Sequence, residues 1–120
     1  MINLRLLIPL ILIIQTVVAQ NEMSPDGTWE IILDEKNTGR DDQWMMVEKF
    51  DQHPSRQEIQ VPAAWERYKQ DYEGVAFYKR SFQVPAHWEN KVVNLEFGAV
   101  NYLSEVWLIL PPLSVKILVE

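Results

Sequence analysis

Carboxylates are the residues of this sequence best suited to chemistry, because paired acids are the commonest hydrolytic device on a β scaffold. Most of them lie in polar segments between apolar runs, where solvated acids are ordinary. The candidates are Asp34/Glu35, Asp41/Asp42, Asp71/Glu73 and Glu89. We expect each of these pairs to be a solvated surface feature, and the sequence predicts no catalytic residue.

Other reactive constellations are missing from the sequence. Neither Ser81 nor Ser104 lies in a Gly-x-Ser-x-Gly turn, and the four glycines are too scattered for a phosphate-binding loop. The absence of cysteine excludes disulfides, thiolate chemistry and cysteine-based zinc sites. The two histidines, His53 and His87, are too far apart for a compact metal motif. No metal and no cofactor are therefore expected.

Aromatic side chains are the second candidate group, because their flat faces can stack on sugar rings. The chain has 5 Trp and 4 Tyr. Trp29 and Trp107 lie in the middle of predicted strands, so we expect them in the core. Trp65, Trp88 and Tyr72 lie in predicted turns, and for them both roles stay open.

The elements that must position these residues are short and separated by turn-forming clusters. Apolar and β-branched patterns predict strands over 28–33, 58–61, 76–84, 92–97 and 103–108. Segment 44–50 is compatible with a helical turn or a short strand, and 63–68 with one turn of helix. This pattern, without any long helical period, predicts an all-β protein, an antiparallel jelly-roll-like β-sandwich that is incomplete at its C-terminus.

Length and charge restrict the class of protein further. A chain of 120 residues suits one domain, and its net charge of −6 argues against nucleic acid and against anionic membrane surfaces. Residues 1–19 combine one basic residue, an apolar run and small residues at the end, as in a secretory signal peptide. The alternatives are an uncleaved anchor or a buried strand. We expect a secreted protein, periplasmic or extracellular, with no membrane association after cleavage.

Five segments, taken in order, resemble a known family. They are 26–30 (DGTWE), 61–66 (VPAAWE), 72–85 (YEGVAFYKRSFQVP), 93–100 (VNLEFGAV) and 106–108 (VWL). Their order and spacing are similar to those of the N-terminal sugar-binding domain of glycoside hydrolase family 2, which includes β-galactosidases, β-glucuronidases and β-mannosidases. The resemblance covers most of residues 20–108 and implies a jelly-roll sandwich with carbohydrate as its ligand.

The chain departs from this family after Leu108. Residues 109–120 (ILPPLSVKILVE) match none of the family's following Asn-Gly turn, Gly-Gly-Tyr segment and further strands. The family's catalytic glutamates lie in a later barrel domain that this chain lacks, so the resemblance implies no catalytic residue here and names that barrel as a partner. It also implies Asp71 and Tyr72 as substrate-binding candidates, because the matching loop lies near the active-site mouth in some members.

The favoured interpretation is a truncated sugar-binding domain of a secreted family 2 glycoside hydrolase, in which the full-length enzyme hydrolyses O-glycosidic bonds. One alternative is a free-standing secreted carbohydrate-binding module, in which the tail closes the sheet and Trp65 or Trp88 stacks on sugar. Another is an interaction domain that adds a partner strand to the edge at 108–119. Truncation also predicts that Leu95, Phe97 and Trp107 are exposed.

Overall fold

The computed structural model describes residues 21–100, 103–109 and 116–119. The expected signal peptide and residues 110–115 of the tail lie outside these ranges. The elements in chain order are β1 (Gly27–Asp34), α1 (Val47–Asp51), β2 (Gln57–Val61), the 3-10 helix η1 (Trp65–Arg67), β3 (Val75–Lys79), the 3-10 helix η2 (Ala86–Trp88), β4 (Val92–Leu95) and β5 (Lys116–Val119). Most of them are strands, so the predicted all-β class is confirmed.

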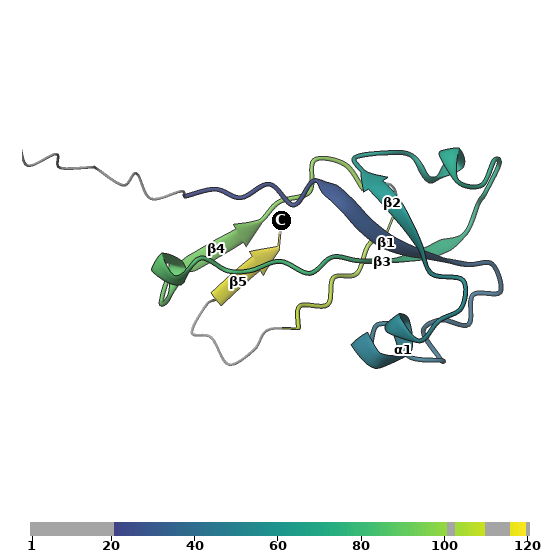
Figure 1. Cartoon of the computed structure of the whole chain (residues 1–120), viewed down its shortest axis with the longest axis horizontal. Coiled ribbons are helices and arrows are strands. Elements are labelled where there is room, and N and C mark those ends of the chain that lie inside the picture. The colour runs from purple at the N-terminus through teal and green to yellow at the C-terminus, as the bar shows by residue number, and fades with distance from the viewer. Residues whose placement is uncertain (1–20, 101–102, 110–115, 120) are drawn as a thin grey trace, which may run out of the picture.

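Strand β1 lies at the centre of a three-stranded antiparallel sheet with the order β2-β1-β3 (Figure 1). The register pairs Trp29 with Ile59 on one side and Ile32 with Phe77 on the other. Successive side chains of a strand point to opposite faces of the sheet. Ile31 and Ile32 are both 0% exposed, so both faces of β1 are covered. Burial on both faces accounts for the two adjacent isoleucines in this strand.

Strands β4 and β5 form a separate two-stranded pair, which Figure 1 shows beside the larger sheet. They run parallel, with Val92 opposite Lys116 and Leu95 opposite Val119. The expected antiparallel arrangement therefore holds for the three-stranded sheet and is wrong for this pair. Parallel strands need a long connection between them, and here residues 96–115 supply it.

The expected strand at 103–108 is not formed, because residues 103–109 have no strand structure. Alternation predicts a strand only if a neighbouring strand completes its hydrogen bonds. Leu103 is 83% exposed, and Trp107 is 47% exposed although its ring stacks on Phe77, with centroids 6.4 Å apart. The prediction that Trp107 lies in the core is therefore wrong, whereas its exposure matches what truncation predicts.

The expected strand at 76–84 is shorter than predicted and ends at Lys79. The next residue, Arg80, contacts β1 through its side chain. Its guanidinium donates a hydrogen bond of 2.6 Å to the carbonyl of Thr28. Segment 44–50, where two structures were possible, contains the start of helix α1. The strand at 58–61 and the helical turn at 63–68 are confirmed as β2 and η1.

The core of the described residues is small and contains six hydrophobic side chains: Ile31, Ile32, Phe50, Ile59, Tyr72 and Trp88. They come from β1, α1, β2, η2 and the loop before β3. Trp29 is half-buried, and its indole N–H donates a hydrogen bond of 2.7 Å to the carbonyl of Pro25. No helix in the described ranges is long and apolar enough to cross a membrane.

Candidate functional site

The loop after β1 is held by a buried carboxylate. Asp34 is 2% exposed, and its two oxygens accept the backbone N–H groups of Thr38 at 2.9 Å and of Gly39 at 2.8 Å. The expectation that Asp34 is a solvated surface acid is therefore wrong. Its charge is compensated by hydrogen bonds from the loop, as buried carboxylates require.

Gly39 allows this loop to pack directly on two aromatic rings. A Cβ atom at this position would lie 2.5 Å from Phe77 and 2.6 Å from Trp44. Contacts this short do not occur between real side chains, so a residue other than glycine would push the rings and the loop apart. The loop is thus in van der Waals contact with the Phe77 side chain of β3.

The rest of the loop is fixed by backbone hydrogen bonds. The N–H of Asp42 donates to the carbonyl of Thr38 at 2.9 Å, and the N–H of Trp44 donates to the carbonyl of Gly39 at 2.8 Å. Gln43 adopts a left-handed conformation with φ 59°, which is unusual for a residue with a side chain. The loop therefore presents its side chains from a defined backbone.

An open hollow of about 540 Å³ lies between this loop and the C-terminal end of α1. Acidic, basic, amide and aromatic side chains and one proline line it: Asp41, Asp42, Gln43, Trp44, Lys49, Gln52, His53 and Pro54. Its volume lies within the range of roughly 300–1,000 Å³ that is usual for small-molecule sites, but it is more open and more polar than most of them. This hollow is therefore the candidate binding site of the described chain.

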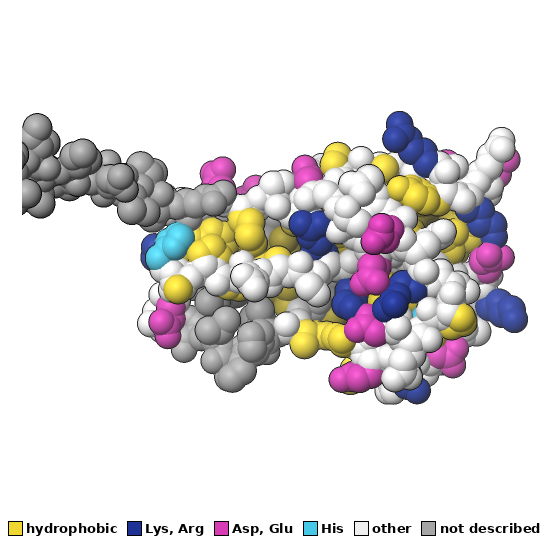
Figure 2. All heavy atoms as spheres, viewed as in Figure 1, with side chains coloured by type: hydrophobic (Ala, Val, Ile, Leu, Met, Phe, Trp, Pro, Cys, Tyr) yellow, Lys and Arg dark blue, Asp and Glu magenta, His cyan; other side chains and the backbone are white. Residues whose placement is uncertain are grey.

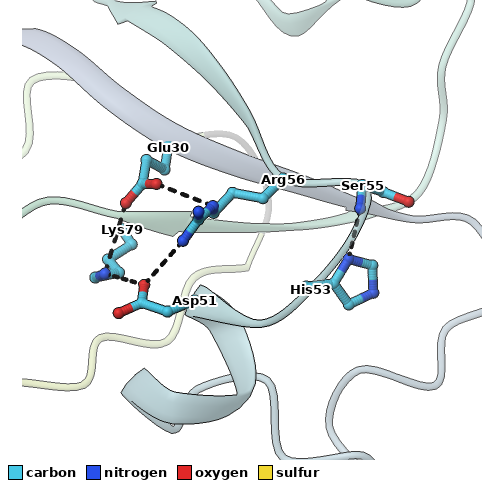
Figure 3. Close-up of polar contacts among 6 residues, drawn as sticks. All are labelled: Glu30, Asp51, His53, Ser55, Arg56 and Lys79. Carbon is cyan, nitrogen blue, oxygen red and sulfur yellow. Dashed lines mark hydrogen bonds and ion pairs between the residues drawn. The ribbon is translucent and has the colours of Figure 1, made fainter.

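Trp44 and His53 form the aromatic wall of the hollow. Their ring centroids lie 4.3 Å apart at an interplanar angle of 62°, and Trp44 also contacts Phe77 edge-on with centroids 5.6 Å apart. Figure 3 shows the backbone N–H of Ser55 donating to Nδ1 of His53, at 3.2 Å. Since Nδ1 is the acceptor, the neutral ring carries its proton on Nε2.

Four charged side chains join α1 to the sheet. Arg56 contacts Glu30 at 3.2 Å and Asp51 at 3.4 Å, while Lys79 contacts Glu30 at 3.5 Å and also pairs with Asp51 (Figure 3). Figure 2 shows acidic and basic side chains next to one another on the surface over the sheet and α1. The two acids and two bases alternate and balance, so this charge ring is a structural link.

Asp71 and Tyr72, the substrate-binding candidates from the sequence, lie away from the hollow. Asp71 is exposed and left-handed, with φ 53°. Tyr72 is 7% exposed, and its hydroxyl donates a hydrogen bond of 2.6 Å to the carbonyl of Val75. Burial, together with the charges of Asp34 and Glu35, raises the pKa of Tyr72. The Tyr72 hydroxyl is thus used in a local hydrogen bond that stabilises the chain between Tyr72 and Val75.

The other two aromatic residues left open by the sequence are placed differently. Trp88 is buried in η2, and half-buried Trp65 packs edge-on against Tyr72 with centroids 5.6 Å apart. Sequence reasoning missed Trp44, Gln52 and His53 as a group. The signal that was present is the run Asp41-Asp42-Gln43-Trp44, in which two acids and an amide precede an indole.

The acids of the described residues are too dispersed to suggest a metal centre, since no three His, Asp or Glu side chains converge there. No protein-family model matches the chain, and no solved structure matches it significantly. The resemblance seen in the sequence therefore stays a prediction, and a functional assignment depends on the site and on how the motif segments are assembled.

Proposed function

We propose that this chain is a non-catalytic carbohydrate-binding β-domain of the kind that precedes the catalytic barrel in family 2 glycoside hydrolases. The observation that carries the proposal is the assembly of the motif segments. Segment 26–30 lies in β1, segment 61–66 begins at the end of β2, and segment 72–85 contains β3. All three therefore meet in the single sheet β2-β1-β3.

Residues of the separate motifs also contact one another directly. Gly27 lies opposite Val61 in the ladder, and the Arg80 guanidinium packs so closely on Gly27 that a Cβ there would be 3.1 Å away. Gly27 has φ 124°, a conformation open to glycine. Such contacts give a physical reason for finding these residue types at these positions, and so support the family resemblance.

The proposal includes a jelly-roll-like sandwich as the complete fold, with β4 and β5 belonging to its second layer. It also includes secretion through the leader at 1–19 and a catalytic barrel as the partner that hydrolyses O-glycosidic bonds. Retaining hydrolysis needs two carboxyls about 5–5.5 Å apart in a fixed cleft. Here Asp34 holds a loop, and Glu30 and Asp51 belong to the charge ring.

A protein-interaction role is the second candidate, and exposed apolar side chains after β4 favour it. These are Phe97, Val100, Leu103, Val106, Trp107 and Ile109, all at least 37% exposed. Figure 2 shows hydrophobic side chains at the surface over β4. Large exposed apolar patches mark interaction surfaces, and a barrel domain or a separate protein partner would cover this one.

Carbohydrate binding can be tested with the full chain by affinity electrophoresis in gels containing neutral β-glucan, β-mannan or β-galactan. We expect retardation in at least one gel and no cleavage of nitrophenyl β-galactoside, β-glucuronide or β-mannoside. Unchanged mobility in every gel would refute carbohydrate binding. Release of nitrophenol by the chain alone would refute a non-catalytic role. A stable oligomer without glycan binding would favour the interaction role.

A further inference from the structure

We propose that the hollow beside Trp44 binds one sugar unit of a neutral glycan. This inference rests on the proposed carbohydrate-binding function and assigns it to a site other than Asp71 and Tyr72. The hollow lies between the loop at 41–44 and the segment at 52–54, on either side of α1. Three features carry the assignment: a fixed aromatic ring, uncommitted polar groups and the balance of charge.

The indole ring of Trp44 is fixed by its packing against neighbouring side chains and the loop backbone. Trp44 packs edge-on against Phe77 and His53, and the missing side chain of Gly39 allows the loop to sit directly against the indole. The backbone N–H of Trp44 donates a hydrogen bond to the Gly39 carbonyl, which fixes the backbone that carries the indole. An indole that is half-buried and already fixed presents its remaining surface with little loss of side-chain entropy on binding. The apolar face of a sugar ring suits such a surface.

Several polar side chains around the indole make no polar contact with other described residues. In the described part of the chain, the side chains of Asp41, Asp42 and Gln52 make no hydrogen bond or ion pair. Carboxylates accept hydrogen bonds, amides both donate and accept, and Nε2–H of His53 donates. Sugar hydroxyls also both donate and accept, so a ring of hydroxyls matches this mixed set better than a purely anionic or cationic ligand would.

The charge of the hollow selects against acidic ligands. Two carboxylates, Asp41 and Asp42, stand against one cation, Lys49. A uronate, a phosphate or a nucleotide would place its negative charge beside both carboxylates, which costs binding energy. The hollow is open to solvent, so neighbouring units of a longer glycan can extend out of it. The site therefore suits an internal or terminal unit of a neutral chain.

The test is a titration of the full chain with cellotetraose, mannotetraose and β-1,4-galactotetraose, and with tetragalacturonate as the charged counterpart. Tryptophans labelled with 5-fluorotryptophan give separate ¹⁹F resonances, and Trp44→Phe identifies that of Trp44. We expect the Trp44 resonance to shift with at least one neutral tetrasaccharide and not with tetragalacturonate. Binding with an unshifted Trp44 resonance would overturn the inference.

A matched pair of variants on exposed positions avoids damage to the fold. Asp42→Asn with Gln52→Ala removes a charge and an amide at the hollow, and Glu48→Gln with Gln57→Ala removes the same groups elsewhere. We expect the dissociation constant for the neutral tetrasaccharide to rise at least about tenfold in the first variant and to stay unchanged in the second.

The outcomes separate this inference from the function on which it rests. If the wild-type chain binds no tetrasaccharide and no polysaccharide, carbohydrate binding itself is refuted, and the hollow with it. If the wild-type chain binds glycan and the hollow variant binds equally well, the function stands and the site is wrong. An equal loss in the control variant would also overturn the site.

Discussion

The carboxylate of Asp34 accepts the backbone N–H of Gly39 at 2.8 Å, and this contact joins the end of β1 to the loop that forms the hollow. The other Asp34 oxygen accepts the N–H of Thr38. The central strand of the sheet thus helps to determine where the Trp44 side chain lies. Changes at this junction should affect stability and the hollow together.

Replacement of Gly39 by alanine should destabilise the fold, because the new methyl would lie 2.5 Å from Phe77 and 2.6 Å from Trp44. Overpacking of this kind typically costs about 1–3 kcal/mol of unfolding free energy. Urea unfolding followed by far-UV circular dichroism measures it. Gly98→Ala is the control, since a Cβ at Gly98 meets nothing within 4 Å. Equal stability of the two variants would contradict the packing described for the loop.

Asp34→Asn should lower the unfolding free energy by about 1–3 kcal/mol, the usual cost of an unsatisfied buried polar group. Each carboxylate oxygen accepts one N–H, whereas an amide would turn its own NH₂ towards one of these donors. Thermal and urea unfolding measure the change. Asp26→Asn, at an exposed position, is the matched control and should leave stability within about 0.5 kcal/mol. A neutral effect of Asp34→Asn would show that the loop does not depend on this charge.

Stability should fall as the pH rises above about 10, the ordinary pKa of tyrosine. Burial raises the pKa of Tyr72 and of Tyr78, so the folded state keeps these hydroxyls protonated where the unfolded state has begun to release the proton. The stabilisation is complete below the unfolded pKa and is lost as the pH rises towards the folded values. Urea unfolding between pH 7 and 11 measures the slope.

The two tyrosines can be separated by substitution. Tyr72→Phe should flatten the alkaline slope and also lower stability at pH 7, because the Val75 carbonyl loses its hydrogen bond. Tyr78→Phe should flatten the slope with little effect at pH 7. An alkaline slope unchanged in both variants would refute the assignment to these groups.

The charge ring should contribute little to stability and should depend on salt. The side chains of Glu30 and Arg56 are about one third exposed, and ion pairs exposed to solvent typically contribute about 0.2–1 kcal/mol. A double-mutant cycle with Glu30→Gln and Arg56→Gln should give a coupling energy in that range at low salt and a smaller one at 1 M salt. A coupling above about 2 kcal/mol would show that the ring is more than a surface link.

Most local elements can be predicted from the residues of each segment alone. Segment 28–33 forms β1 because its β-branched and aromatic residues favour an extended backbone, and Pro62 ends β2 because it has no N–H for a ladder. Pro85 likewise precedes η2. These preferences are set by each residue and its nearest neighbours, so they can be read without knowledge of the fold.

Which elements pack against one another, and which side chains become buried, depends on the folded structure. The pattern at 103–108 predicts a strand, but in the described chain no strand pairs with this segment, and Trp107 only stacks on Phe77 and stays 47% exposed. The sequence predicts that Asp34 is a solvated acid, but in the folded chain β1 and the loop after it bury this side chain. The hollow combines Trp44 with His53, which are brought together by α1. Burial and convergence depend on contacts between distant segments, and local sequence patterns do not contain that information.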